Sequence, residues 1–322
     1  MGIYFTFDDM SKIIAIANNK GGVGKTTTVA ALAYAWSAKG YKVLLVDLDS
    51  QANLTQITSP TPLEDIEMTV KEAIAYGVQP PITRLSKTLD LIPSGLELSN
   101  FENEVAGVSC REFLVSDMLN KIKSNYDVIL IDCPPALGLL TYNALVAADH
   151  LVMTATADSL SYAGMLMISG LAKSIRENPR LNPELKTSAV IVTKFKSNKL
   201  TNSFLRKIRD EIGPALIEPP VREATKIQQA TAFKQSIFQY DPEGNATKDY
   251  QAVADALEER ILKDMNRSYP STESEKEEAN KKRTSINLDE NIYTDFKVYC
   301  AKNGKSISGL IEEAMVNIMN GR

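Results

Sequence analysis

The sequence is poor in the residues that build metal centres, disulfide frameworks and membrane spans. Its 322 residues include one histidine, His150, and three cysteines, Cys110, Cys133 and Cys300. The cysteines form no C-x-x-C pair, which argues against a zinc or disulfide framework and favours a reducing compartment. No apolar run approaches the roughly 18 residues that a membrane helix needs, and the start lacks the basic-then-apolar order of a signal peptide. We therefore expect a cytoplasmic protein without a membrane span.

Positive charge is also in the minority. Lysine and arginine number 36 against 40 aspartates and glutamates, which gives a net charge of −4. No basic field covers the whole chain, so a nucleic-acid site would have to be a local patch. Hydrophobic residues make up 44% of the chain, which is ample for a sizeable core, and the length suggests about two domains.

The most informative stretch is glycine-rich and runs from Asn18 to Thr28 as Asn-Asn-Lys-Gly-Gly-Val-Gly-Lys-Thr-Thr-Thr. An apolar β-branched run at 12–17 precedes it and a helical pattern at 26–39 follows it, which is the context of a phosphate-binding loop. Glycines let successive backbone N–H groups face one anion, and the pattern assigns Lys25 to the β- and γ-phosphates, Thr26 to Mg²⁺ and Thr27 to the α-phosphate. The predicted nucleotide contacts are Gly21, Gly22, Val23, Gly24, Lys25, Thr26 and Thr27.

Lys20 departs from the usual loop, which has glycine at that position. Lys25 already serves the nucleotide of its own chain, so a second lysine is better placed to reach across a subunit interface. The run Lys-Gly-Gly-Val-Gly-Lys-Thr-Thr resembles the deviant Walker A motif of the ParA/MinD family of ATPases. This resemblance implies a homodimer with ATP sandwiched between its subunits, in which Lys20 contacts the phosphates bound to the partner and takes part in catalysis with Lys25.

Three carboxylates follow predicted strands. Asp47 and Asp49 end the run 43–46, and Asp132 ends the run 128–131. Ligands of open parallel sheets sit beyond the carboxyl ends of strands, so these aspartates belong to the same crevice as the loop. By resemblance, Asp49 positions the attacking water, Asp47 supports the metal, and Asp132 is the Walker B residue that holds Mg²⁺ through water.

Strands and helices alternate along the first 265 residues, which predicts an α/β fold with a doubly wound, mainly parallel sheet. Further strands are expected at 89–92, 151–154 and 188–192, and further helices at 69–76, 162–176 and 246–265. We assign no chemistry to residues 59–103, and we expect Met165 and Met167 to fill the core.

Residues 190–234 differ from the rest of the chain in charge. They hold nine cations against four anions, which favours contact with phosphate backbones, although dispersed lysines on a solvated face would give the same count. In the resembled family this face binds DNA non-specifically, and our candidates are Lys194, Lys196, Arg222 and Lys226. The segment 218–224 resembles the family's proline-containing segment near the adenine, which makes Pro219 a candidate nucleotide contact.

The last residues predict a separate small module. Residues 266–282 are polar and read as a flexible linker, and 283–322 follow a strand, helix, Asn-Gly, helix pattern that resembles the ribbon-helix-helix DNA-binding domain. Such a module is too small to fold without dimerising. Arg283, Ser285 and Asn287 would face base edges, and Ser306 a phosphate. The module carries five cations and five anions, so a purely dimerising tail is the alternative.

Together the motifs and the family resemblance imply a bacterial, nucleoid-associated DNA partition ATPase with ATP and Mg²⁺ as cofactors. Its ATP-bound dimer would hold non-specific DNA, and a centromere-binding partner would stimulate the slow hydrolysis that releases it. The C-terminal module would add site-specific DNA binding. Two alternatives are a membrane-associated spatial regulator like MinD, which would need a basic amphipathic C-terminal helix, and a transcriptional repressor gated by ATP.

Overall fold

The computed structural model describes residues 3–5, 11–263 and 286–288. The chain divides into two compact units, one formed by Met10–Met265 and one that joins Met1–Asp9 to Asn266–Arg322. Each unit is described by itself.

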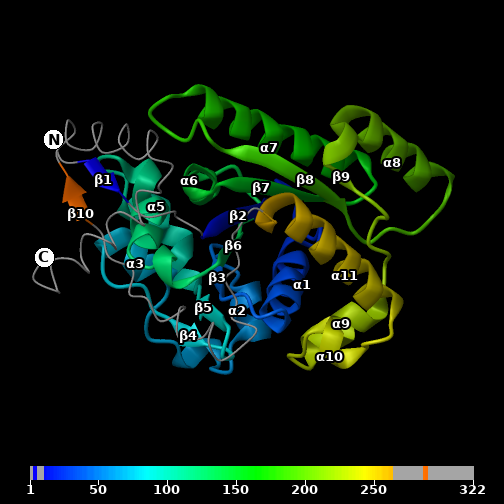
Figure 1. Cartoon of the computed structure of the whole chain (residues 1–322), viewed down its shortest axis with the longest axis horizontal. Coiled ribbons are helices and arrows are strands. Elements are labelled where there is room, and N and C mark those ends of the chain that lie inside the picture. Colours follow the sequence, from blue (N-terminus) through cyan, green and yellow to red (C-terminus); the bar gives the residue numbers. More distant parts are fainter. Residues whose placement is uncertain (1–2, 6–10, 264–285, 289–322) are drawn as a thin grey trace, which may run out of the picture. The chain divides into compact units, whose positions relative to one another are not determined.

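The larger unit is built on an eight-stranded sheet with the order β4-β5-β3-β6-β2-β7-β8-β9 (Figure 1). All neighbouring strands run parallel except β4, which is antiparallel to β5 at one edge. The predicted doubly wound, mainly parallel sheet is therefore confirmed. The strands are β2 (Lys12–Ala17), β3 (Val43–Asp47), β4 (Thr83–Arg84), β5 (Leu89–Ile92), β6 (Val128–Asp132), β7 (His150–Ala155), β8 (Lys186–Val192) and β9 (Leu216–Ile217).

Two apolar cores lie on opposite faces of the sheet, because successive side chains of a strand point to opposite faces. In β2, Ile14 and Ile16 belong to one core, whereas Ile13, Ala15 and Ala17 belong to the other. The first core is covered by α1 (Lys25–Ala38), α2 (Asn53–Thr58), α9 (Thr225–Ala232), α10 (Ile237–Tyr240) and α11 (Asn245–Leu257) (Figure 1). The second is covered by α3 (Val70–Tyr76), α4 (Phe101–Glu104), α5 (Leu114–Asn120), α6 (Leu139–Ala147), α7 (Ser159–Glu177) and α8 (Lys199–Ile212).

Side-chain caps set the start of several helices. Thr69 and Glu72 form a capping box on α3, Asn198 and Thr201 form one on α8, and Asp158 caps α7 by accepting from Ser161 N. The predicted helix at 246–265 differs from the structure, since α11 ends at Leu257 and a π-helical turn follows from Glu258 to Leu262. We did not predict α8. Most of the surface of this helix is polar and its apolar stripe is narrow, since Leu205 and Ile208 are its buried residues.

In the smaller unit, β1 (Ile3–Phe5) pairs antiparallel with β10 (Ile286–Leu288). Tyr4 lies opposite Asn287 in this register. The predicted linker, both helices of the predicted module, Cys300 and the candidate DNA contacts Arg283, Ser285 and Ser306 lie outside the described residues.

Candidate nucleotide-binding site

The glycine loop connects the carboxyl end of β2 to α1, as predicted. Gly22 and Gly24 have φ angles of 74° and 80°, in the left-handed region that favours glycine, whereas Gly21 does not. A Cβ atom on Gly24 would also lie 3.1 Å from Thr193 Oγ1. The loop conformation therefore requires glycine at two of the three positions.

Two side chains hold the loop in place, one at the start of the loop and one just beyond β8. Asn18, fully buried at the start of the loop, donates through Nδ2 to Thr154 O at 2.7 Å and to Ser161 O at 3.3 Å, and its Oδ1 accepts from Lys20 N at 2.9 Å. Thr193, just beyond β8, donates its hydroxyl to Val23 O at 2.8 Å. The loop is thus fixed to β7, α7 and β8 before any ligand binds.

Lys25 lies at the first position of α1 with only 6% of its surface exposed, and its Nζ donates to Lys20 O at 3.1 Å. Burial lowers the pKa of this ammonium, against the opposing effect of Asp132, Cys133 and Asp49. An anion bound beside it would favour the charged form. Lys25 is therefore placed where a polyphosphate would meet both the helix N-terminus and a buried cation.

Asp132 ends β6 next to Lys25 and is 1% exposed. Neither of its carboxylate oxygens makes a well-aligned hydrogen bond among the described residues, although the Thr26 hydroxyl lies close enough to lower the pKa of this carboxyl. Burial and the neighbouring Asp47 raise the pKa of Asp132 well above its ordinary value, while Thr26 and Lys25 oppose the shift. A buried carboxylate with two unpartnered oxygens is the donor set that Mg²⁺ and its bound waters would satisfy, so the residues present fit this metal.

Asp47, the partner of Asp132 across β3 and β6, differs in its contacts. Its Oδ2 accepts from Thr55 N at 2.9 Å and Thr55 Oγ1 at 2.8 Å, and its Oδ1 accepts from Asp49 N at 3.1 Å. Burial raises the pKa of Asp47 to about 6 despite these hydrogen bonds. Asp47 thus fixes the turn that carries Asp49. It would support a bound metal indirectly, by holding this turn in position.

Lys20, the unusual lysine of the loop, forms an ion pair within the chain. Its Nζ lies 2.9 and 3.0 Å from the two carboxylate oxygens of Asp158, the N-cap of α7. Burial acts to raise the pKa of Asp158, but hydrogen bonds from Thr156, Ser161 N and Lys20 lower it below its ordinary value. Sequence reasoning missed Asp158, because nothing in its local pattern marks it as a partner of a residue 138 positions away.

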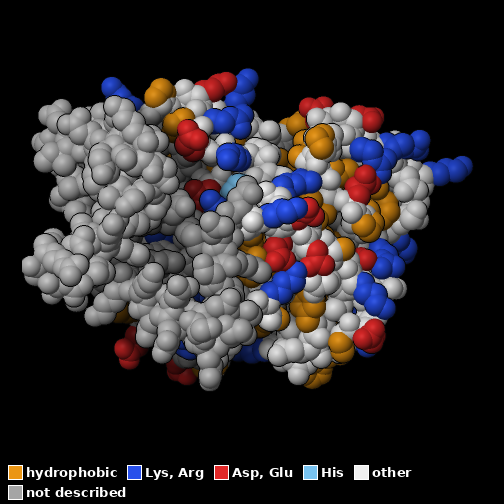
Figure 2. Space-filling model, viewed as in Figure 1, with side chains coloured by type: hydrophobic (Ala, Val, Ile, Leu, Met, Phe, Trp, Pro, Cys, Tyr) orange, Lys and Arg blue, Asp and Glu red, His pale blue; other side chains and the backbone are white. Residues whose placement is uncertain are grey.

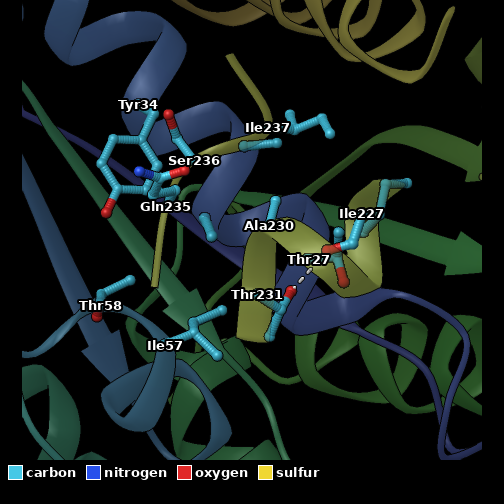
Figure 3. Close-up of a pocket in the computed structure, with 12 residues that line it drawn as sticks. Thr27, Tyr34, Ile57, Thr58, Ile227, Ala230, Thr231, Gln235, Ser236 and Ile237 are labelled. Atoms are coloured by element: carbon cyan, nitrogen blue, oxygen red, sulfur yellow. Dashed lines mark hydrogen bonds between the residues drawn. The ribbon is translucent and has the colours of Figure 1, made fainter. Parts of the chain in front are cut away.

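A narrow apolar groove begins at Thr27 and follows α1 (Figure 3). Thr27, Ala30, Ala31 and Tyr34 form one stripe of α1 in its floor, with α2 on one side and α9 and α10 on the other. None of the lining side chains is charged. The lining residues are Thr27, Ala30, Ala31, Tyr34, Ile57, Thr58, Ile227, Ala230, Thr231, Gln235, Ser236 and Ile237.

The predicted basic segment is exposed on and around α8, where Figure 2 shows Lys and Arg side chains interspersed with acidic ones. Some of its cations are already engaged. Arg222 pairs with the buried Asp249 at 2.7 Å, and Lys226 lies over the ring of Tyr240. In the part of the chain that the structure describes, Lys194, Lys196, Lys199 and Arg206 are exposed and form neither an ion pair nor a contact with an aromatic ring, and we call these four the accessible cations.

Pro219 lies exposed beyond the end of β9, and a cis peptide bond joins it to Glu218. It does not line the groove along α1, so its predicted contact with the nucleotide stays a prediction.

The structure also places the two methionines predicted in the core and the single histidine. Met165 is buried in the core, whereas Met167 is 52% exposed and its sulfur accepts from Asn19 Nδ2, so the prediction of a core role for Met167 was wrong. His150 begins β7, and its Nδ1 lies 2.6 Å from Ser188 Oγ. Burial, with Lys12 and Lys186 nearby, lowers the pKa of His150 to about 4, so it stays neutral as a structural residue.

Among the described helices, none is long and apolar enough to cross a membrane.

Known proteins are similar to this chain in sequence and in fold. A protein-family model described as an AAA domain matches residues 11–187, and one described as ParG matches residues 261–321. Over 255 residues the chain is 32% identical to the sporulation initiation inhibitor protein Soj of Bacillus subtilis, covering 76% of this chain and 97% of Soj. It is 30% identical over 256 residues to the chromosome partitioning protein ParA of Caulobacter vibrioides, covering 76% of this chain and 92% of that protein.

Two solved structures extend the comparison. A putative plasmid partition protein from Borrelia burgdorferi bound to AMPPNP is 25% identical with a TM-score of 0.67, covering 78% of this chain and 100% of that one. Cobyrinic acid a,c-diamide synthase from Mycobacterium smegmatis with bound ADP and magnesium is 28% identical with a TM-score of 0.66, covering 77% and 94%.

Proposed function

Because the chain belongs to the ParA/MinD family of P-loop proteins and carries a ParG-like module, we propose that it is a magnesium-dependent ATPase that partitions DNA. The observation that carries this proposal is the convergence of the glycine loop, the buried Lys25 and the unpartnered carboxylate of Asp132 at one edge of the sheet. Similarity to partition proteins and the accessible cations around α8 support DNA as the partner.

The residues divide the work of hydrolysis among them. Backbone N–H groups of Gly21 to Thr27 and the Lys25 ammonium would bind the phosphates, and Thr26 and Asp132 would hold Mg²⁺. The metal neutralises charge on the β- and γ-phosphate oxygens when bound. Asp49 is 8% exposed on the turn fixed by Asp47, and there it would orient the attacking water. Catalysis of this kind is mainly positioning and charge stabilisation, which a rigid loop supplies.

Lys20 acts in the dimer in our proposal. In one chain it is held by Asp158, so contact with the phosphates of the partner requires this ion pair to open. Both side chains are partly exposed, at 33% and 40%, so the pair is worth at most about 1 kcal/mol. Opening this ion pair therefore adds a small free-energy cost to dimerisation, which the contacts with bound ATP can offset.

We expect Asp158→Ser to strengthen ATP-dependent dimerisation by up to about thirtyfold, because serine keeps the cap of α7 while it releases Lys20 in both subunits of the dimer. Sedimentation velocity at a series of protein concentrations with ATP and Mg²⁺ measures the change. Lys20→Ala is the matched variant, and it should dimerise poorly with or without Asp158→Ser. A wild-type dimerisation constant for Asp158→Ser, or a normal dimer of Lys20→Ala, would show that Lys20 has no role across the interface.

Non-specific DNA binding is assigned to the accessible cations that follow β8. Replacement of Lys194 and Lys196 by alanine should weaken ATP-dependent binding to random-sequence DNA and reduce the slope of log K against log salt by about 2. The control is Lys173→Ala with Lys186→Ala, which removes the same charge from the exposed part of α7 and from the opposite end of β8. Fluorescence anisotropy over a salt series compares the two pairs. The proposal fails if ATP does not raise DNA affinity, or if both double variants lose the same amount.

The ParG-like module at 261–321 favours a DNA-directed role over the membrane-associated alternative. We propose that it dimerises and adds site-specific binding, with Arg283, Ser285 and Asn287 toward base edges and Ser306 toward a phosphate. A centromere-binding partner protein would stimulate hydrolysis by the ATPase domain. The DNA-bound form would then be associated with the nucleoid, and binding to the promoter of its own gene would give the repressor activity named as the second alternative.

A further inference from the structure

Thr193 occupies the junction between the glycine loop and the basic segment. It is the first residue after β8, is 1% exposed, and keeps the sheet geometry by donating its N–H to Ala155 O at 2.8 Å. Its hydroxyl donates to Val23 O at 2.8 Å. Among the described residues it is the one hydrogen-bond donor to this carbonyl.

This hydrogen bond sets the orientation of the Val23–Gly24 peptide. In a trans peptide the C=O and N–H bonds point in opposite directions, so a carbonyl directed at Thr193 turns the N–H of Gly24 away from β8. Gly24 is also in direct contact with Thr193, because a Cβ atom on it would lie 3.1 to 3.4 Å from three atoms of the threonine side chain. A displacement of Thr193 would therefore change the direction of one N–H that the loop offers to an anion.

The chain continues from Thr193 directly into the accessible cations. Lys194 has a φ of 50°, and Phe195 N donates to Val221 O at 2.9 Å, which ties the segment to the loop after β9. Glu223 N in turn donates to Phe195 O at 3.1 Å. The backbone from Thr193 to Phe195 is thus fixed at one end by the glycine loop and at the other by residues 221–223.

We propose that Thr193 is a positioning residue with two roles: its hydroxyl orients the glycine loop for the phosphates, and it transmits the state of that loop to the basic segment that begins at Lys194. This inference rests on the proposed function, because it needs both ATP binding and DNA binding. It adds the residue through which the two sites affect each other.

The test compares two substitutions in the full-length chain. Thr193→Val keeps the shape of the side chain and removes the hydroxyl, whereas Thr193→Ser keeps the hydroxyl.

We expect Thr193→Val to raise KM for ATP by about tenfold, because a buried carbonyl loses its donor, with a smaller effect on kcat. At saturating ATP it should also lose most of the ATP-induced gain in affinity for random-sequence DNA. Thr193→Ser should keep both properties close to those of the wild type. Steady-state hydrolysis and fluorescence anisotropy with and without ATP give the two readouts.

The outcomes separate this inference from the proposed function. If the wild type is active and Thr193→Val has the same KM for ATP and the same ATP-induced gain in DNA affinity, the role of Thr193 is overturned. The proposed function would then be unaffected. Thr193→Ser that folds but behaves like Thr193→Val would also overturn it, because the hydroxyl would then not matter. A wild type without ATPase activity would instead refute the proposed function. If Thr193→Val is insoluble, Thr193→Ala against Thr193→Ser makes the same comparison.

Discussion

Replacement of Asp132 by asparagine should make the ligand-free protein more stable and at the same time reduce hydrolysis by at least about a hundredfold, because the residue is placed for a cation rather than for the fold. Its carboxylate is buried with no hydrogen-bond partner for either oxygen within the described residues. The cost of such burial is on the order of 1–3 kcal/mol, which corresponds to a melting temperature higher by several degrees in a domain of this size. Differential scanning calorimetry without nucleotide measures the gain.

The pH dependence of this gain has a definite sign. The pKa of Asp132 is raised in the folded state, so its contribution to stability is fully present below the unfolded value near 3.8 and is lost as pH rises through the folded value. Protonated aspartic acid and asparagine carry the same charge. The difference in melting temperature between Asp132→Asn and wild type should therefore be largest above neutral pH and shrink in acid.

Asp47→Asn is the matched control, because Asp47 is equally buried but its oxygens accept hydrogen bonds from Thr55 and Asp49. An amide in its place would direct N–H groups at donors, so this variant should be less stable than wild type. Addition of ATP and Mg²⁺ should raise the melting temperature of wild type and not of Asp132→Asn. If Asp132→Asn melts below wild type at pH 8 without nucleotide, Asp132 is a structural residue and the metal assignment is wrong.

The parts of the site that follow a local pattern could be predicted from the sequence. The strand Lys12–Ala17 and the strand Leu89–Ile92 have the predicted bounds, and the glycine loop lies between β2 and α1 as expected. Apolar β-branched runs and glycine spacing are properties of a few consecutive residues, so they need no tertiary information. Ligands of open parallel sheets bind beyond the carboxyl ends of the strands, so Asp47 and Asp132 were expected in the same crevice. The structure pairs these two residues across β3 and β6.

The residues that support the site could not be predicted, because their contacts join distant parts of the chain. Thr193 bonds to a residue 170 positions away, and Asn18 bonds to Thr154 across 136 positions. Arg222 was predicted as a DNA contact from the charge of its segment and the family resemblance, whereas its ion pair with Asp249 depends on how α11 packs and could not be predicted. Met167 was expected in the core because methionine commonly fills irregular apolar space, yet its side chain is exposed and contacts Asn19.

The close approach of α7 to the glycine loop leads to the last prediction, which concerns two glycines of one helix. A Cβ atom on Gly164 would lie 2.4 Å from Asn18 Oδ1 and 3.4 Å from Lys20 N, whereas one on Gly170 would meet nothing within 4 Å. Asn18 is held by three hydrogen bonds, so it cannot move aside without losing them. The same substitution should therefore have opposite effects at the two positions.

Gly170→Ala should stabilise the protein by about 0.5–1 kcal/mol through helix propensity and leave ATP binding unchanged. Gly164→Ala should gain the same propensity but lose more through the displaced Asn18, with a net destabilisation of about 1–2 kcal/mol and an affinity for ATP lower by at least tenfold. Chemical denaturation and equilibrium binding of a fluorescent ATP analogue measure the two effects. Equal ATP affinities for the two variants would mean that the loop does not depend on Asn18, and the rigid cradle inferred from this structure would then need another support.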